Sequence, residues 1–472
     1  MPKQPTREKK VRKNPILPDW DELRKQVVPY TFVEARRLKI DIYDALTQEL
    51  YENGSVMGGL LLSCLIMKEQ KLYEGQAIHL RFKDKRKFLI EFFFNLRDGE
   101  GALATDREKG MEVCARNMYR IIKLFEANLR SYEWAFSDVL SYAFKMCLPF
   151  DGKMKNHENL VRVFYKFGRY FGEKCVHMDF CSTVLERAQV ICRGEDWLSD
   201  EIINVEFDIF CSLHKDVAYA TANLLISLGR QTEDAVEATS YGAKAVSAIS
   251  EIGRYMHKAQ YCRTTLDYVD ILTNHNYLDD ALASLSRIEN DVRYFSDLEF
   301  DILWARFNYE KGRVYTYKNI SELALKTLHI GLEKAHELNL NDLEIKGLKL
   351  VGENYGYLQD WRRARQTFDR ARTLANEIGD TYSKTLMYFL SANLIKQQFM
   401  AHSKLLVKSR RRYNPIAFHI FTEWKFKSIS FWHYYSVNDL KELMGNSDCI
   451  IDETRIYRRL RRTLSSRGTK SY

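Results

Sequence analysis

Apolar side chains recur every three or four residues along much of the chain, and this helical spacing is clearest between residues 348 and 371. A polar turn at residues 358–361 divides that segment into two amphipathic halves. We expect the small residues Gly352 and Ala364 where the two helices cross, with Tyr355 and Phe368 filling the space beside them. Such a hairpin cannot bury its apolar face alone, so the pattern predicts stacked neighbours in an all-α solenoid. The small and apolar positions of the segment are Leu348, Val351, Gly352, Tyr355, Ala364, Phe368 and Ala371.

Three earlier segments repeat this pattern. The small residues that open the four second helices are Ala235, Ala281, Ala324 and Ala364, at spacings of 46, 43 and 40 residues. In this alignment the first hairpin lacks a large residue at Thr239. The hairpins resemble those of the tetratricopeptide repeat family, whose usual period is about 34 residues. The longer spacing predicts elongated repeats, and a helix expected at 383–404 would cap the last apolar face.

The N-terminal half shows weaker helical patterns, and residues 106–193 are interpreted as two diverged hairpins of the same superfamily. Five of the seven prolines lie in the first 29 residues and strand signals are weak, so an all-α body is expected. The predicted organisation is a basic disordered tail (1–30), diverged helical hairpins (31–200), a repeat array with its capping helix (201–405), and a basic and aromatic extension that the pattern does not place (406–472). The N-terminal helical patterns run roughly through 33–68, 83–97, 106–127, 131–147, 157–172 and 177–193.

The net charge of +9 is concentrated in three segments. Residues 1–18 carry +5, residues 404–412 carry +5 and residues 455–470 carry +7, so the rest of the chain is about −8. The basic ends either contact an acidic polymer, such as the microtubule surface or nucleic acid, or are solvated tails. The segment 455–462 has one aromatic residue, Tyr457, whereas single-stranded nucleic acid favours several stacking aromatics, so nucleic acid is not the expected partner.

The chain offers no signature of an enzyme, a cofactor site or a metal site. Asp98-Gly99-Glu100-Gly101 lacks the further glycine and the preceding strand of a phosphate-binding loop. Cys175, His177 and Cys181 lack the second ligand pair of a zinc site. The nine cysteines are scattered without a C-x-x-C pair, which indicates reduced thiols in a cytoplasmic protein. The apolar run 57–67 is shorter than the ~20 residues of a membrane span, so it predicts a buried helix and no membrane contact.

Protein binding is the function that the repeats favour. In this repeat class the first helices line a groove, and counting back from Ala281, Ala324 and Ala364 gives its exposed positions. Their tyrosines and arginines are typical interface anchors, and their basic character predicts an acidic, extended or helical segment of a partner. The alternative is a solvated face with no partner. The predicted groove residues are Arg263, Arg306, Tyr309, Arg313, Tyr317, Lys346, Lys349 and Tyr357, with Asp270, Asn274 and Glu353 beside them.

A diverged helical N-terminal half, the hairpin at 157–188 and elongated repeats before a loose tail resemble the tetratricopeptide repeat protein 29 family. That resemblance implies an axonemal protein of motile cilia and flagella, with dynein-arm or intraflagellar transport components as partners. We therefore expect a non-enzymatic adaptor of the axonemal cytoskeleton that serves ciliary or sperm motility. The alternative is a general cytosolic or nuclear adaptor in an RNA-processing or other multiprotein complex.

Overall fold

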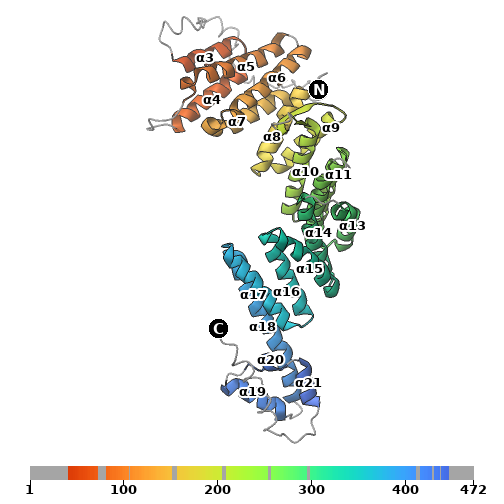
Figure 1. Cartoon of the computed structure of the whole chain (residues 1–472). Helices are drawn as coiled ribbons and strands as arrows, with labels where there is room; N and C mark the ends of the chain where they lie inside the picture. The colour runs from red at the N-terminus through yellow and green to blue at the C-terminus, as the bar shows by residue number, and fades with distance from the viewer. Residues whose placement is uncertain are drawn as a thin grey trace, which may run out of the picture. The chain divides into compact units, whose positions relative to one another are not determined.

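The computed structural model describes residues 41–72, 81–105, 107–150, 157–204, 209–253, 257–294, 298–410, 415–427, 430–435 and 437–445. The chain divides into two compact units, residues 1–254 and 255–472. Figure 1 labels their helices, and in both units helices adjacent in sequence pack against each other in pairs. The expected fold class, an all-α solenoid of helical hairpins with elongated repeats, is confirmed.

The first unit consists of helical hairpins and one short β-hairpin. Its helices are α3 (Ile42–Glu52), α4 (Val56–Leu72), α5 (Arg86–Thr105), α6 (Arg107–Glu126), α7 (Leu129–Cys147), α8 (Glu158–Glu173), α9 (Met178–Cys192), α10 (Leu213–Gln231) and α11 (Ala235–Glu251). Two 3-10 turns, η1 (Phe82–Asp84) and η2 (Leu148–Phe150), lie next to α5 and α7. The hairpins predicted within residues 106–193 correspond to α6 with α7 and α8 with α9.

The antiparallel strands β1 (Leu198–Asn204) and β2 (Ile209–Ser212) are the only strands in the described ranges, and the sequence did not predict them. Leu198 lies opposite Ser212. The connecting sequence holds no glycine or proline, so the usual hairpin signal is missing.

The second unit continues the hairpin pattern. Its helices are α12 (Lys258–Asn274), α13 (Leu278–Tyr294), α14 (Leu298–Tyr317), α15 (Ser321–Glu337), α16 (Asn341–Tyr357), α17 (Trp361–Glu377), α18 (Thr381–Arg410), α19 (Pro415–Lys427), α20 (Phe431–Tyr434) and α21 (Val437–Gly445). The pairs α12–α13, α14–α15 and α16–α17 form the hairpins, and the first helix α14 also contacts the first helices α12 and α16.

The fully described turns of the second unit, between α12 and α13 and from α14 to α18, each contain one residue with a left-handed backbone. At the α14–α15 turn, Asn319 has φ 60°, and the N–H of Ile320 donates to the carbonyl of Tyr315 at 2.9 Å. The N–H of Asn319 donates to Thr316 at 3.0 Å, which completes a Schellman motif. The same pair of hydrogen bonds closes the turn at Gln359, 40 residues later. The first helices of these two successive hairpins therefore end in the same way. The other residues of this type are Asn276, Asn339 and Gly379.

The structure corrects the alignment of the first hairpin by three residues. Ala281, Ala324 and Ala364 are fully buried. Each of them is the fourth residue of its helix. In α11 the buried residue at that position is Ala238, not Ala235, which is the first residue of the helix. The sequence alignment failed here because the large residue expected four positions later is replaced by the buried Gly242.

The small residues lie at close helix crossings, as predicted. A Cβ atom added to Gly352 would lie 2.5 Å from the ring of Phe368, and one added to Gly312 would lie 2.5 Å from Leu328 Cγ. Phe368 packs in a buried cluster with Ala364 and Ala371, and the half-buried Tyr355 lies against it. Glycine is therefore required where α14 meets α15 and where α16 meets α17.

The helix expected to be buried at 57–67 is covered on one face only. Leu61, Leu62 and Leu65 of α4 are buried, but Met57 and Leu60 are exposed. The apolar run extends around the whole helix, whereas the neighbours α3, α5 and α7 cover one side of it. The prediction of a buried helix therefore holds for one face of α4 and not for the other. None of the described helices is long and apolar enough to cross a membrane.

The expected capping helix is α18, which packs on α17 and continues to Arg410. Part of the extension that the sequence did not place packs on the second half of α18. Its buried cluster consists of Leu406, Ala417, Ile420, Phe431 and Leu440. The predicted tail at 1–30 and the basic segment 455–470 lie outside the described residues.

Replacing Gly352 by alanine should destabilise the protein. The new Cβ would overlap a buried ring, and overpacking of this kind costs about 1–3 kcal/mol, more than the ~1 kcal/mol that alanine gains over glycine in a helix. Gly101→Ala is the matched control, because no described atom outside the adjoining backbone of α5 lies within 4 Å of the added Cβ. Urea denaturation should show a loss for Gly352→Ala and a gain for Gly101→Ala. Equal effects of the two substitutions would contradict the close crossing.

Candidate protein-binding surfaces

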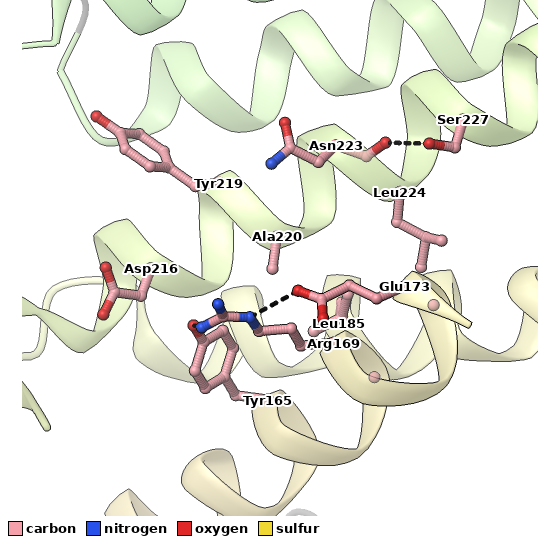
Figure 2. Close-up of a pocket in the computed structure, with 12 residues that line it drawn as sticks. Tyr165, Arg169, Glu173, Leu185, Asp216, Tyr219, Ala220, Asn223, Leu224 and Ser227 are labelled. Carbon is pink, nitrogen blue, oxygen red and sulfur yellow. Dashed lines mark hydrogen bonds and ion pairs between the residues drawn. The ribbon is translucent and has the colours of Figure 1, made fainter. Parts of the chain in front are cut away.

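A pocket of about 280 Å³ lies between the first helices α8 and α10 of two adjacent hairpins. Gly172 permits the close approach of these helices, because an added Cβ would lie 3.1 Å from Leu224 Cδ1. On the α8 side, Arg169 is fixed by two contacts (Figure 2). Its Nε donates to Glu173 at 2.9 Å, and its Nη1 donates to the hydroxyl of Tyr165 at 2.8 Å.

The α10 side of the pocket carries groups that can still form hydrogen bonds. The exposed amide of Asn223 has no side-chain hydrogen-bond partner within the described part of the chain, and Figure 2 shows it near Tyr219. An amide has both a donor and an acceptor, so Asn223 could pair with the backbone of an extended peptide. The fixed Arg169 could meet a carboxylate or a carbonyl across the pocket.

The predicted groove covers the three later repeats only, so it does not include this pocket. Counting back from Ala238 by the offsets used for the later repeats places Asn223 and Ser227 on the groove face. Counting from Ala235 gives Leu224 and Leu228, which are buried. The pattern of apolar residues in α10 could have revealed the difference.

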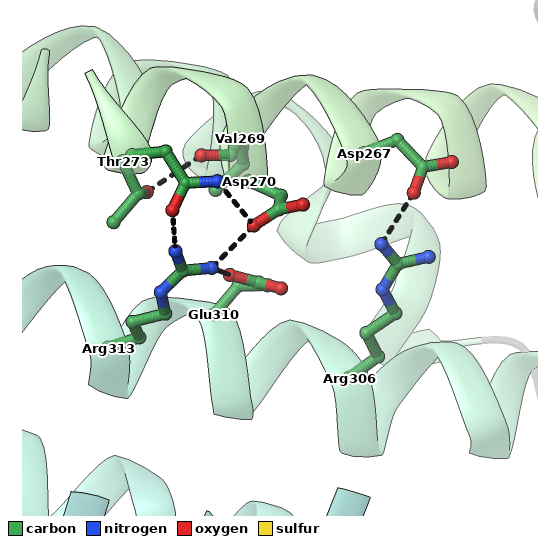
Figure 3. A network of polar contacts seen from close by, with 8 residues as sticks. Asp267, Val269, Asp270, Thr273, Arg306, Glu310 and Arg313 are labelled. Atoms are coloured by element: carbon green, nitrogen blue, oxygen red, sulfur yellow. Dashed lines mark hydrogen bonds and ion pairs between the residues drawn. The ribbon is translucent and has the colours of Figure 1, made fainter. Parts of the chain in front are cut away.

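The predicted groove residues lie on α12, α14 and α16 of the second unit. Figure 3 shows how the two arginines of α14 reach across to α12. Arg306 pairs with Asp267 at 2.6 Å, and Arg313 pairs with Asp270 at 2.6 Å. Arg313 also pairs with Glu310 at 3.2 Å and donates to the side-chain oxygen of Asn274. These arginines therefore connect two successive repeats.

Burial controls the electrostatics of this polar network. The side chain of Arg313 is only 11% exposed. Burial alone would lower its pKa, but Glu310 and Asp270 raise it, so the guanidinium stays charged. Burial raises the pKa of Glu310 to about 7, although Arg313 acts to lower it. Two carboxylates share one guanidinium here, and Glu310 is the one that burial disfavours as an anion.

The other three cations of the predicted groove also have acidic neighbours. Arg263 pairs with Glu299 at 2.8 Å, Lys346 pairs with Asp342 at 2.7 Å, and Lys349 lies 3.9 Å from Glu353. Each pair is partly exposed, and pairs of this kind can be displaced by a partner at small cost. The positive potential expected over the groove is therefore reduced by the carboxylates of the same helices.

The three tyrosines of the predicted set differ in accessibility. Tyr309 is half-buried, and burial raises its pKa. Tyr317 and Tyr357 are 48% and 63% exposed and are the last residues of α14 and α16, 40 positions apart. The guanidinium of Arg313 lies 5.7 Å from the ring centre of Tyr317. The structure therefore places two exposed aromatic side chains at equivalent ends of successive first helices.

No arrangement for metal binding is found among the residues that the structure describes. Cys181 is buried and its thiol donates to the carbonyl of Val176, whereas Cys175 is exposed. His177 precedes α9 with a left-handed backbone. Comparison with known protein families and with curated proteins finds no match to this chain.

Replacing Glu310 by glutamine should change how stability depends on pH. A raised pKa in the folded state means that the native protein holds this proton more tightly than the unfolded chain. The stability that this bound proton contributes is therefore fully present below about pH 4.5, the pKa of Glu310 in the unfolded chain. It is lost as the pH rises through about 7, the pKa in the folded protein. Glu310→Gln cannot lose a proton, so its stability relative to the wild type should improve by about 1–3 kcal/mol between pH 5 and pH 8.

Urea denaturation of both proteins at the two pH values measures this difference. Glu322→Gln, at an exposed position of α15, is the control for replacing a carboxylate by an amide outside the network around Arg313. Parallel pH curves for Glu310→Gln and wild type would show that Glu310 titrates as it does in the unfolded chain.

Proposed function

We propose that this chain is a non-enzymatic adaptor that holds a segment of a partner protein along the first-helix faces of its repeats. The observation that carries the proposal is the exposure of Tyr317 and Tyr357 at equivalent positions of α14 and α16. Tyrosines lose little conformational entropy on binding and are enriched among the residues that dominate interface energies. The α8–α10 pocket, with the open amide of Asn223, offers a similar surface in the first unit.

The ion pairs affect which partner chemistry the second unit would favour. Arg306 and Arg313 are engaged between repeats, so they preorganise the surface and are poor candidates for direct contact with a partner. Acidic groups of a partner would meet the more exposed cations Arg263, Lys346 and Lys349. We propose a partner segment that combines acidic groups with apolar side chains that pack on the tyrosines.

For the cellular setting, we propose the axoneme of a motile cilium or flagellum, with dynein-arm or intraflagellar transport proteins as partners. Support comes from the resemblance to the tetratricopeptide repeat protein 29 family in layout and repeat pattern. Contact of the basic ends with microtubules is part of the same proposal and rests on their sequence charge alone.

The double substitution Tyr317→Ala with Tyr357→Ala should weaken partner capture by about 10-fold or more, because two aromatic anchors are lost. Substitution of Arg306 or Arg313 would disturb the contact between α12 and α14, so the tyrosines give the cleaner test. The measurement is proximity labelling by the tagged full-length chain in a flagellated cell. Wild type should label axonemal dynein-arm or transport proteins, and the double variant should not.

Phe426→Ala is the matched control, because Phe426 is an exposed aromatic residue of α19, outside the first-helix faces. This variant should label the same proteins as wild type. Labelling confined to non-axonemal proteins would rule out the axonemal role. Equal labelling by wild type and the tyrosine variant would rule out the first-helix face as the binding surface.

A further inference from the structure

Helix α18 begins like the first helix of another repeat. It packs on α17 and also contacts α16, as α16 packs on α15 and contacts α14. Met387 and Leu394 of α18 join the buried cluster around Phe368, and Leu394 Cδ1 would lie 3.3 Å from a Cβ added to Gly356. At the 40-residue period, Tyr388 and Ala392 occupy the positions of Leu348 and Gly352 in α16.

The place of the second helix in this repeat is not filled by the described helices that follow. In α16, Leu348 is 4% exposed and Gly352 meets Phe368 of the second helix α17. In α18, Tyr388 is 53% exposed and Ala392 is exposed as well.

The helices α19 to α21 pack further along α18. There the amide of Gln398 donates to the carbonyl of Trp432, and His402 contacts the carbonyl of Tyr435. The first half of α18 thus has a packing face for a second helix and no described helix on it.

The chemistry of α18 indicates what this face would accept. Near the open face it carries Lys384 and Lys396, its other three basic residues lie between 404 and 410, and none of its 30 residues is acidic. Lys396 is exposed and has no carboxylate partner within the described ranges. The guanidinium of Arg372 of α17 lies 4.9 Å from the ring centre of Tyr388 and pairs with Asp369 at 3.2 Å in a partly exposed ion pair. Phe389, 62% exposed, extends the aromatic surface next to Tyr388. The face is aromatic and positively charged.

We propose that the first half of α18 is the docking site for an acidic amphipathic helix of a partner protein, which takes the place of the missing second helix. An apolar side chain of that helix would sit on Ala392, as Phe368 sits on Gly352. The side chain would be smaller than phenylalanine, because alanine leaves less room than glycine. Acidic groups on its flanks would meet Lys396 and would compete with Asp369 for Arg372. The inference rests on the proposed protein-binding function and gives it a second surface and a defined ligand chemistry.

Two other occupants fit the charge less well. Residues 446–472 of the chain itself carry seven basic and three acidic residues, so this tail would place like charge on a basic helix. In a symmetric dimer through this face, the basic residues of α18 would face those of the second copy. Single-stranded nucleic acid would match the charge and the aromatic rings but does not use a helix-sized packing place.

The test uses a labelled 17-residue peptide with the sequence of α15, residues 321–337, in which Lys326 and Lys334 are replaced by glutamate. A hydrocarbon staple between two positions on its outer face holds it helical, and the comparison peptide carries the same staple. Fluorescence anisotropy measures its binding to the full-length chain. We expect saturable binding, and binding at least about 10-fold weaker for a peptide whose glutamates are all replaced by lysine. No binding of the acidic peptide, or equal binding of both peptides, would overturn the proposal.

Variants of the chain separate packing from charge. Tyr388→Ser with Phe389→Ser should weaken binding of the acidic peptide at least about 10-fold. Ala392→Arg adds a positive charge but fills the packing place, so binding should fall. A rise would mean attraction by charge alone and would overturn the proposal. All three positions are exposed, and circular dichroism of each variant should match wild type.

Further measurements distinguish the other occupants and the other surface. Tyr317→Ala with Tyr357→Ala should leave peptide binding unchanged. If this variant alone loses the peptide, the ligand lies on the first-helix face, which supports the proposed function and overturns the α18 site.

Deletion of residues 446–472 should have little effect. A 10-fold gain would identify the tail as the occupant. Tighter binding of a 20-nucleotide single strand than of the peptide would identify a nucleic-acid surface, and loss of self-association in the α18 variants would identify a dimer contact.

Discussion

Close approach of helix backbones at small residues is the constraint on which the repeat stack depends. Gly352 lets α16 approach the ring of Phe368, and Gly312 lets α14 approach Leu328. At these crossings the two helices of a hairpin are separated by a single layer of apolar side chains. The other faces of the hairpin can then pack against the next hairpin. The Schellman turns at Asn319 and Gln359 give successive hairpins the same entry into the second helix. Crossing and turn together fix where the first helices present their side chains.

Contact between first helices explains the polar character of the predicted groove. The side chains of Arg306 and Arg313 lie at the junction between α12 and α14, and carboxylates of α12 neutralise them. Partly buried ion pairs of this kind add little net stability, but they fix the register of the elements that they join, because an unpaired buried charge is costly. The side chains left for recognition are those outside the junction, such as Tyr317, Tyr357 and, in the first unit, Asn223.

Local pattern was sufficient to predict much of this arrangement, and contacts between hairpins were not predictable from it. Ala281, Ala324 and Ala364 were assigned correctly because a large residue follows each of them four positions later. The equivalent residue of the first hairpin, Ala238, was missed because Gly242 stands where a large residue was expected. The carboxylate partners of Arg306 and Arg313 come from another helix, and their distance depends on the register between hairpins, which hydrophobic spacing does not encode. The open face of α18 was missed because hydrophobic spacing shows that a face is apolar but does not show whether another helix covers it. Among the described residues, no helix packs on this face.

The length of α18 has a mechanical consequence. At 1.5 Å per residue, its 30 residues extend over about 45 Å without a break. Its first half belongs to the repeat stack through Met387, and its second half belongs to the C-terminal cluster through Leu406. A continuous helix transmits bending and rotation along its length, so a movement of one packing cluster is passed on to the other. Force applied to the C-terminal helices would therefore reach the last repeat directly, without a flexible linker to absorb it.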